Sequence, residues 1–133
     1  MKGYRVKSDS ERGAAAVEFA LILPVFIILL FGIIEFGAAY NAQILVTNAA
    51  REAARSMTLT GVEADAVAAA AAATAPIGLA IDADDVEFTV SSGGVCTSPA
   101  RLNVVVTVDK PLLTGLFGAT FTLTGQAMRQ CGG

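Results

Sequence analysis

An uninterrupted apolar run over residues 19–34 limits this chain more than any other feature of its sequence. None of the residues in this run is polar, and residues 14–17 before it are apolar as well, so that only Glu18 interrupts the segment 14–34. As a helix at about 1.5 Å per residue, this segment would cover about 31 Å, close to the ~30 Å hydrocarbon core of a bilayer. The run therefore predicts one membrane-spanning helix near the N-terminus. Pro24 is tolerable within such a helix.

The charges on the two sides of this segment predict its orientation. Four cationic residues precede it, accompanied by two acidic ones: Lys2, Arg5, Lys7 and Arg12, with Asp9 and Glu11. After the segment, no Lys or Arg appears until Arg51. Because positive residues stay on the cytoplasmic side, we expect a single-pass protein with a cytoplasmic N-terminus. Everything after about residue 40 is then extracytoplasmic.

The composition argues against several classes of function. The chain is 54% hydrophobic and only 16% charged, against ~25% charged in ordinary soluble domains. It has no histidine, which rules out a Ser-His-Asp triad, a Cys-His dyad and any histidine-based metal site. The net charge of −3 and the lack of a basic stripe beyond the first dozen residues argue against nucleic-acid binding. We therefore expect a protein that is not an enzyme, with no catalytic residue, cofactor, metal ligand or small-molecule substrate.

Glu18 needs an explanation, because a carboxylate within an apolar run costs about 1–3 kcal/mol depending on its depth. In one interpretation it extends toward the membrane interface and complements the positive end of the helix dipole. In the other, a cationic group neutralises it within the membrane. Cleavage between Gly13 and Ala14 would create such a group, an α-amino group four residues before Glu18. In an array of helices, that amine could face the Glu18 of a neighbouring subunit.

Two segments of the chain read Arg-Gly-Ala-Ala-Ala-Val-Glu-Phe-Ala-Leu-Ile-Leu-Pro (12–24) and Asn-Ala-Ala-Arg-Glu-Ala-Ala-Arg (48–55). Both segments closely resemble the TadE-like family. Members of this family look like pilin-like minor subunits of tight-adherence (Flp) type IV pilus systems. Type IV prepilins have a short basic leader that ends in Gly, and a Glu at the fifth mature position followed by an aromatic residue. Counted from Ala14, Glu18 is fifth and Phe19 is sixth.

The resemblance implies a set of roles for these residues. Gly13 would end the leader, cut by a prepilin peptidase, and Ala14 would begin the mature protein. Glu18 would determine processing and assembly, with Phe19 as its recognition neighbour. The chain would then consist of a basic leader (1–13), a transmembrane helix (14–39) and an extracytoplasmic pilin-like head (40–133). Its partners would be the peptidase, the membrane and other pilin-like subunits that contact the N-terminal helix. The subunit would be extracted into a pilus or would stay at its base.

Beyond the span, helical character continues to about residue 58. Leu45, Ala49 and Ala53 share one face, which either packs on the chain's own C-terminal domain or contacts another subunit. Thr60 and Glu63 fit a capping box for a second helix over about 62–74, which Pro76 ends. The alanine tract 68–73 favours this helix.

The remaining sequence alternates between apolar and polar residues over 86–91, 102–108 and 121–126. Alternation with a period of two predicts three strands, each with one apolar face, in a small antiparallel sheet lying on the helices. The expected fold class is therefore α+β, with a long N-terminal transmembrane helix that continues into a helix-plus-sheet head.

Three further features of this region have alternative interpretations. Cys96 and Cys131 are the only cysteines and are expected to form a disulfide rather than a metal or redox pair. The apolar connection 110–118 either caps the core or touches membrane or a partner. The acidic residues near the first strand are expected to form a solvated turn rather than a calcium site. These are Asp82, Asp84, Asp85 and Glu87.

Two other readings of the whole chain do not involve pili. In one, the chain is an extracytoplasmic binding domain secreted through a long Sec signal cut after Ala39. In the other, it is a signal-anchored binding domain that is never cleaved. The first residue of the mature protein distinguishes these readings, since it would be Ala14 for a pilin, Tyr40 for a secreted domain and Met1 for an anchored one.

Overall fold

A computed structural model gives the structure of the protein and describes residues 9–115 and 118–132. Its main elements are two helices and three strands, α1 (Asp9–Thr60), α2 (Glu63–Thr74), β1 (Val86–Val90), β2 (Arg101–Pro111) and β3 (Thr120–Gln130). Two short 3-10 helices, η1 (Ala75–Ile77) and η2 (Ala83–Asp85), connect α2 to β1. The predicted α+β fold is confirmed. The expected leader cations Lys2, Arg5 and Lys7 lie outside the described residues.

Contacts divide the chain into two units, Met1–Phe36 and Gly37–Gly133. In the first unit, all residues of α1 from 12 to 34 are exposed, so the apolar side chains cover the helix on every side. A helix that is apolar all round belongs inside a large core or a membrane. Within the described residues, α1 is the one helix long and apolar enough to cross a membrane. This finding suggests a single-pass membrane protein.

The turn between α1 and α2 differs from its prediction. The helix ends at Thr60 and is followed by Gly61, whose φ of +67° favours glycine and whose N–H donates to the Met57 carbonyl, 3.0 Å away. The predicted capping box is wrong, because Val62 rather than Thr60 precedes α2. Thr60 belongs to the last turn of α1, where its hydroxyl lies 3.1 Å from the Ser56 carbonyl oxygen and accepts from the Val62 N–H.

The second helix and the strands occur where the sequence predicts them. Helix α2 ends at Thr74, and Pro76 lies in η1 directly after it. The strands form an antiparallel sheet in the order β1-β2-β3, with Val104 of β2 opposite Phe88 and Ala127. Strands β2 and β3 are each longer than predicted. Their additional residues, such as Lys110–Pro111 and Met128–Gln130, do not follow the apolar alternation on which the prediction rested.

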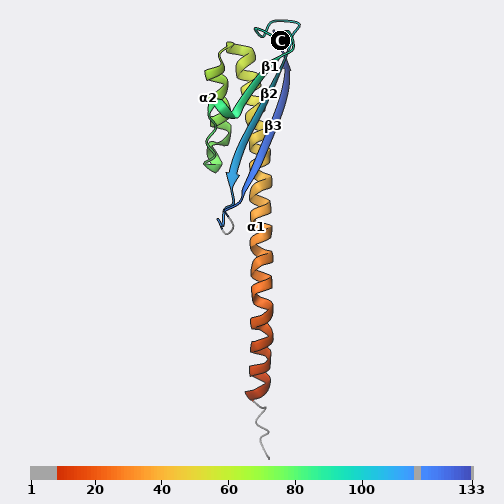
Figure 1. The fold of residues 1–133 in the computed structure, drawn as a ribbon, viewed down its shortest axis with the longest axis vertical. Helices are drawn as coiled ribbons and strands as arrows, with labels where there is room; N and C mark the ends of the chain where they lie inside the picture. The colour runs from red at the N-terminus through yellow and green to blue at the C-terminus, as the bar shows by residue number, and fades with distance from the viewer. Residues whose placement is uncertain (1–8, 116–117, 133) are drawn as a thin grey trace, which may run out of the picture. The chain divides into compact units, whose positions relative to one another are not determined.

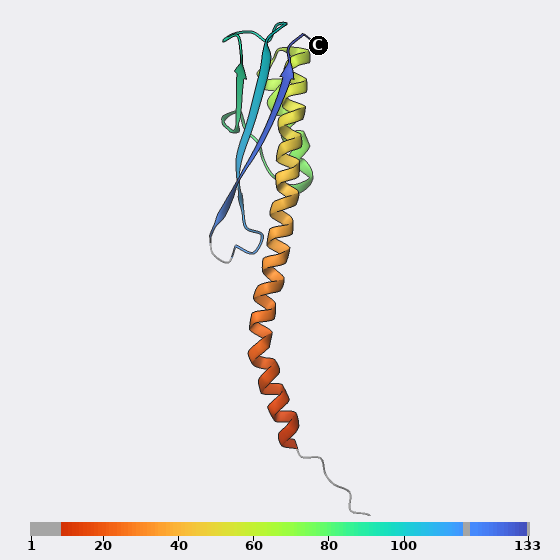
Figure 2. The same cartoon turned by 90° about the vertical axis from the view of Figure 1, so that its right-hand side faces the viewer.

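In the second unit, the helices cover one face of the sheet, as Figures 1 and 2 show from two directions. The buried face of α1 consists of small side chains, Ala42, Val46, Ala49, Ala50, Ala53 and Ala54. They join one core with Ala66 and Ala70 of α2 and with alternate residues of β2, Leu102, Val104, Val106 and Val108. Ala49 and Ala53 therefore pack within the chain's own domain, one of the two predicted alternatives, whereas Leu45 is only half-buried.

Strand β3 lies unusually close to α1 at Gly125. A Cβ atom at this position would meet the Val46 carbonyl oxygen and would lie 2.7 Å from its carbonyl carbon and 2.8 Å from the Thr47 Cα. Next to this contact, the Gln43 Nε2 donates to the Thr124 carbonyl oxygen at 2.7 Å. Because the opposing atoms belong to the helix backbone, no side-chain rotation can make room for a larger residue.

Replacing Gly125 with alanine is therefore expected to destabilise the second unit by about 1–3 kcal/mol, the usual cost of overpacking a core. Urea unfolding of the full chain in detergent, followed by circular dichroism, measures this cost. Gly94→Ala is the matched control, because a Cβ there has nothing within 4 Å and is expected to change stability little. Equal unfolding curves for the two variants would contradict the close contact.

Candidate processing and assembly site

The four residues predicted to form the processing site, Gly13, Ala14, Glu18 and Phe19, all lie in α1. Helix α1 is already formed at Asp9, the first residue that the structure describes, so the Gly13–Ala14 bond lies inside helical backbone. Gly13 weakens the helix next to this bond by about 1 kcal/mol relative to alanine. The helix therefore opens more easily at this bond than it would with alanine at position 13.

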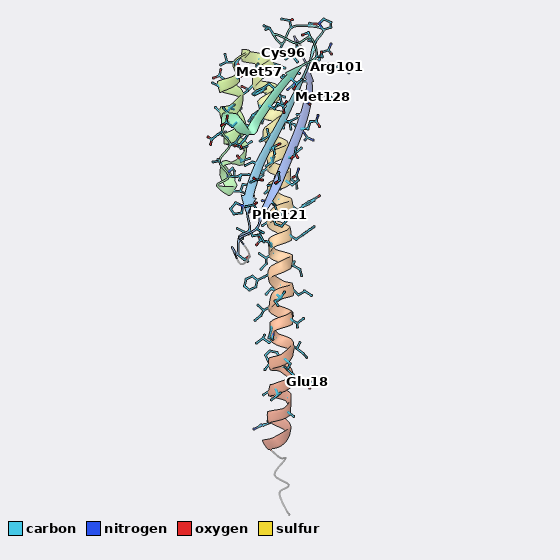
Figure 3. All side chains as sticks on the ribbon, viewed as in Figure 1. Glu18, Met57, Cys96, Arg101, Phe121 and Met128 are labelled. Carbon is cyan, nitrogen blue, oxygen red and sulfur yellow. A yellow bond between two sulfur atoms is a disulfide. The ribbon has the colours of Figure 1, made fainter. Side chains whose placement is uncertain are left out.

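Glu18 lies one helical turn after Ala14, about 6 Å along the helix axis and on the same face. Figure 3 labels Glu18 on the N-terminal part of α1, where the neighbouring side chains are mostly apolar. Its side chain is exposed, and within the described part of the chain it has no hydrogen bond or ion pair. A carboxylate without such a partner is costly in a membrane. The geometry therefore leaves Glu18 available to a cationic partner on another molecule.

Phe19 lies on a different side of the same helix from Ala14. With Ile22, Leu23 and Phe26 it lines a shallow recess of about 240 Å³. These residues follow the i, i+3, i+4, i+7 spacing of one helix face, so they form a continuous apolar stripe. Such a stripe can accept a ridge of side chains from a second apolar helix. Glu18 and Phe19 thus offer a charged contact and a packing surface side by side.

The predicted disulfide between Cys96 and Cys131 is present, with a Cα–Cα distance of 5.2 Å. Cys131 is only 1% exposed, and its N–H donates to the Ala100 carbonyl oxygen at 2.9 Å. The bond joins the connection between β1 and β2 to the end of β3. It therefore ties the end of β3 to the connection that joins the end of β1 to the start of β2.

The acidic cluster forms the exposed turn that the sequence predicts. Its centre is η2, where the Asp85 Oδ2 accepts from the Asp82 N–H at 2.9 Å. Among the described residues, no group of three or more His, Cys, Asp or Glu side chains is placed to hold a metal ion.

A recess of about 690 Å³ lies between β1 and the α1–α2 turn, and Glu63 is the one charged side chain in its lining.

Sequence reasoning missed the residues that position β3 on α1, Gln43 and Gly125. A signal for Gly125 is present, because a glycine at an inward position of an alternating strand often marks a close approach of two backbones. Gln43 gave no comparable signal, since a polar residue on a helix is ordinary.

The fold and the site define a protein with one N-terminal apolar helix and a small disulfide-linked α+β unit. Residues 13–55 match the family model described as TadE-like protein. The match begins at Gly13 and covers the apolar run and most of the remainder of α1, which confirms the resemblance over this segment. No curated protein and no solved structure matches the chain significantly.

Proposed function

We propose that this protein is a non-enzymatic pilin-like subunit, a minor pilin or pseudopilin, of a tight-adherence (Flp) type IV pilus or secretion system. The TadE-like match suggests a pilus-associated component of this system. The observation that carries the finer proposal is the position of Glu18. It lies one turn after the Gly13–Ala14 bond, exposed and without a partner within the described residues. A prepilin peptidase that cuts this bond would create the cationic partner that the carboxylate needs.

In this mechanism the apolar helix holds the subunit in the membrane until several subunits pack together. The Ala14 amine of one subunit then pairs with Glu18 of a neighbour. A hydrogen-bonded pair that involves charged groups contributes about 1.5–3 kcal/mol, which offsets the ~1–3 kcal/mol that a lone carboxylate costs in an apolar run. The stripe that contains Phe19 packs against the neighbouring helix. Because the amine and the carboxylate are a fixed distance apart along each helix, their pairing sets the register between subunits.

The N-terminus is cytoplasmic in this proposal, and residues 40–133 are extracytoplasmic. Two features support this orientation. Cationic residues precede the span and are absent from the stretch that follows it, up to Arg51. The Cys96–Cys131 disulfide lies in the second unit, and disulfides persist outside the reducing cytoplasm.

Exchange of the span tests the role in pilus assembly. In the native host, we expect deletion of the gene to abolish or strongly reduce pili, and wild-type protein to restore them. A chain in which residues 19–34 are replaced by an unrelated leucine-alanine helix of equal length keeps Glu18 and should still insert into the membrane. It should not restore pili, because the packing stripe is lost. Electron microscopy counts the pili, and full restoration by the exchanged span would contradict the proposal.

A further inference from the structure

One end of the second unit carries exposed apolar and aromatic side chains. Tyr40 of α1, Leu113 of the β2–β3 connection and Phe121 of β3 are 66%, 63% and 39% exposed. We refer to these three residues as the apolar rim. In the connection 110–118, Leu113 is exposed and Leu112 is half-buried, whereas Leu116 and Phe117 lie outside the described residues, so capping of the core by this connection stays a prediction. A cluster of exposed apolar side chains can mark a contact with another molecule or with a membrane, whereas such residues scattered singly are ordinary.

The contacts between α1 and β3 place the rim at one end of the unit. Thr124 contacts Gln43, and Gly125 lies against Val46, so β3 and α1 run side by side. At the far end, Met57 lines the same recess as Cys96, which is bonded to Cys131 after β3. The two elements therefore run in the same direction. The start of β3 and the β2–β3 connection must lie toward Gly37 and Tyr40, the start of the unit.

Figure 3 shows the same arrangement, with Phe121 at one end of the sheet and Met57 and Cys96 at the other. The apolar run ends at residue 34, only three residues before the unit begins at Gly37. Because the chain is continuous, the end of the unit that contains Gly37 stays at the membrane surface whatever the angle between the two units. The rim is therefore held within reach of lipid.

The charges near the rim determine which kind of surface it fits. Lys110, half-buried, is paired with Phe121 in the sheet, and Asp109 accepts a hydrogen bond from the Thr122 hydroxyl at 2.6 Å. Val86, directly after the acidic turn at η2, pairs with Val106 in the antiparallel sheet, so this turn lies beside the half of β2 that leads to Lys110. Acidic groups thus outnumber cations here, so attraction to anionic headgroups cannot drive the contact. Apolar insertion, with the tyrosine at the headgroup level, fits this composition.

We propose that the apolar rim inserts into the interface of the bilayer and docks this end of the second unit on the lipid surface. The partner is a zwitterionic lipid surface. Leu113 and Phe121 insert into it as apolar anchors, and Tyr40 lies at the headgroup level. The inference rests on the membrane span and not on the role in a pilus. Since the contact is apolar, it should be insensitive to salt.

The absence of tryptophan from the chain allows a direct test. Leu113→Trp provides a single fluorophore in the rim of the full-length protein, reconstituted in phosphatidylcholine vesicles. The matched control is Leu59→Trp, at a residue that is 71% exposed in the last turn of α1, at the other end of the unit. We expect lipids brominated near the top of their acyl chains to remove most of the Leu113→Trp emission and little of the control emission. Aqueous iodide should show the reverse.

Two results would overturn the inference. Equal iodide quenching of both variants, without quenching by brominated lipid, would place the rim in water. Emission at short wavelength that neither quencher affects would place Leu113→Trp inside the protein. Disulfide formation on a non-reducing gel checks that each variant folds. If Leu113→Trp does not fold, Phe121→Trp, an exchange between aromatic residues, repeats the test. Retention of the leader in the native protein would contradict the proposed function without affecting this measurement.

Discussion

Replacing Glu18 with alanine is expected to leave membrane insertion intact and to reduce subunit assembly roughly ten- to a hundredfold. The variant removes a carboxylate that costs free energy in the apolar run, so insertion should be unchanged or improved. It also removes the partner of the Ala14 amine, a charged pair worth about 1.5–3 kcal/mol. Each 1.4 kcal/mol, approximately, is a factor of ten in an equilibrium constant. Chemical crosslinking in isolated membranes, followed by immunoblotting, compares the monomeric and assembled forms.

Glu52→Ala is the matched control for this measurement. Glu52 lies on the same helix, in the second unit, and its contact with Arg55 at 4.0 Å is largely exposed to solvent. Such a pair contributes little to stability, so the control should assemble normally. Equal amounts of crosslinked subunit in the Glu18→Ala variant and the wild type would argue against the proposed pairing. A parallel loss of insertion and assembly would assign Glu18 to the insertion step instead.

Replacing both Cys96 and Cys131 with serine is expected to lower the free energy of unfolding of the second unit by about 3–4 kcal/mol. The two cysteines are 35 residues apart, and closing a loop of this size removes that much chain entropy from the unfolded state. The effect is large for this unit because its helices contribute mainly alanines to the core. Each alanine buries little apolar area. Urea unfolding of the full chain in detergent, without reductant, measures the loss.

Reduction of the wild type provides the control for the disulfide. Dithiothreitol should lower the stability of the wild type to nearly that of the double-serine variant and leave the variant unchanged. The comparison separates loss of the bond from any packing effect of serine at the buried position 131. Overlapping unfolding curves for the oxidised wild type and the variant would show that the bond contributes no stability.

Much of the fold follows from periodicity in the sequence. The apolar run 19–34 could only be a span or a deeply buried helix, and the alternation of Leu102, Val104 and Val106 fitted a strand with one buried face. The disulfide followed from there being two cysteines on the expected extracytoplasmic side. These signals are local, so one sequence was sufficient to read them.

Features that depend on three-dimensional contacts could not be read in the same way. The proposed capping box had the correct residue types, yet α1 extends through Thr60 and uses its hydroxyl differently. The contact of Gly125 with the α1 backbone joins positions about eighty residues apart. The sequence assigned Gly13 to the leader and Ala14, Glu18 and Phe19 to the helix, whereas α1 includes all four residues. Cleavage of the Gly13–Ala14 bond also requires another protein, so it stays a prediction.

The first residue of the protein isolated from membranes of its native host shows whether the Gly13–Ala14 bond is cut. Mass spectrometry of the N-terminal peptide identifies this residue without any variant. We expect Ala14, because only cleavage after Gly13 frees an amine one turn before Glu18. A chain that begins at Met1, or at Tyr40, while still performing its function would contradict the account.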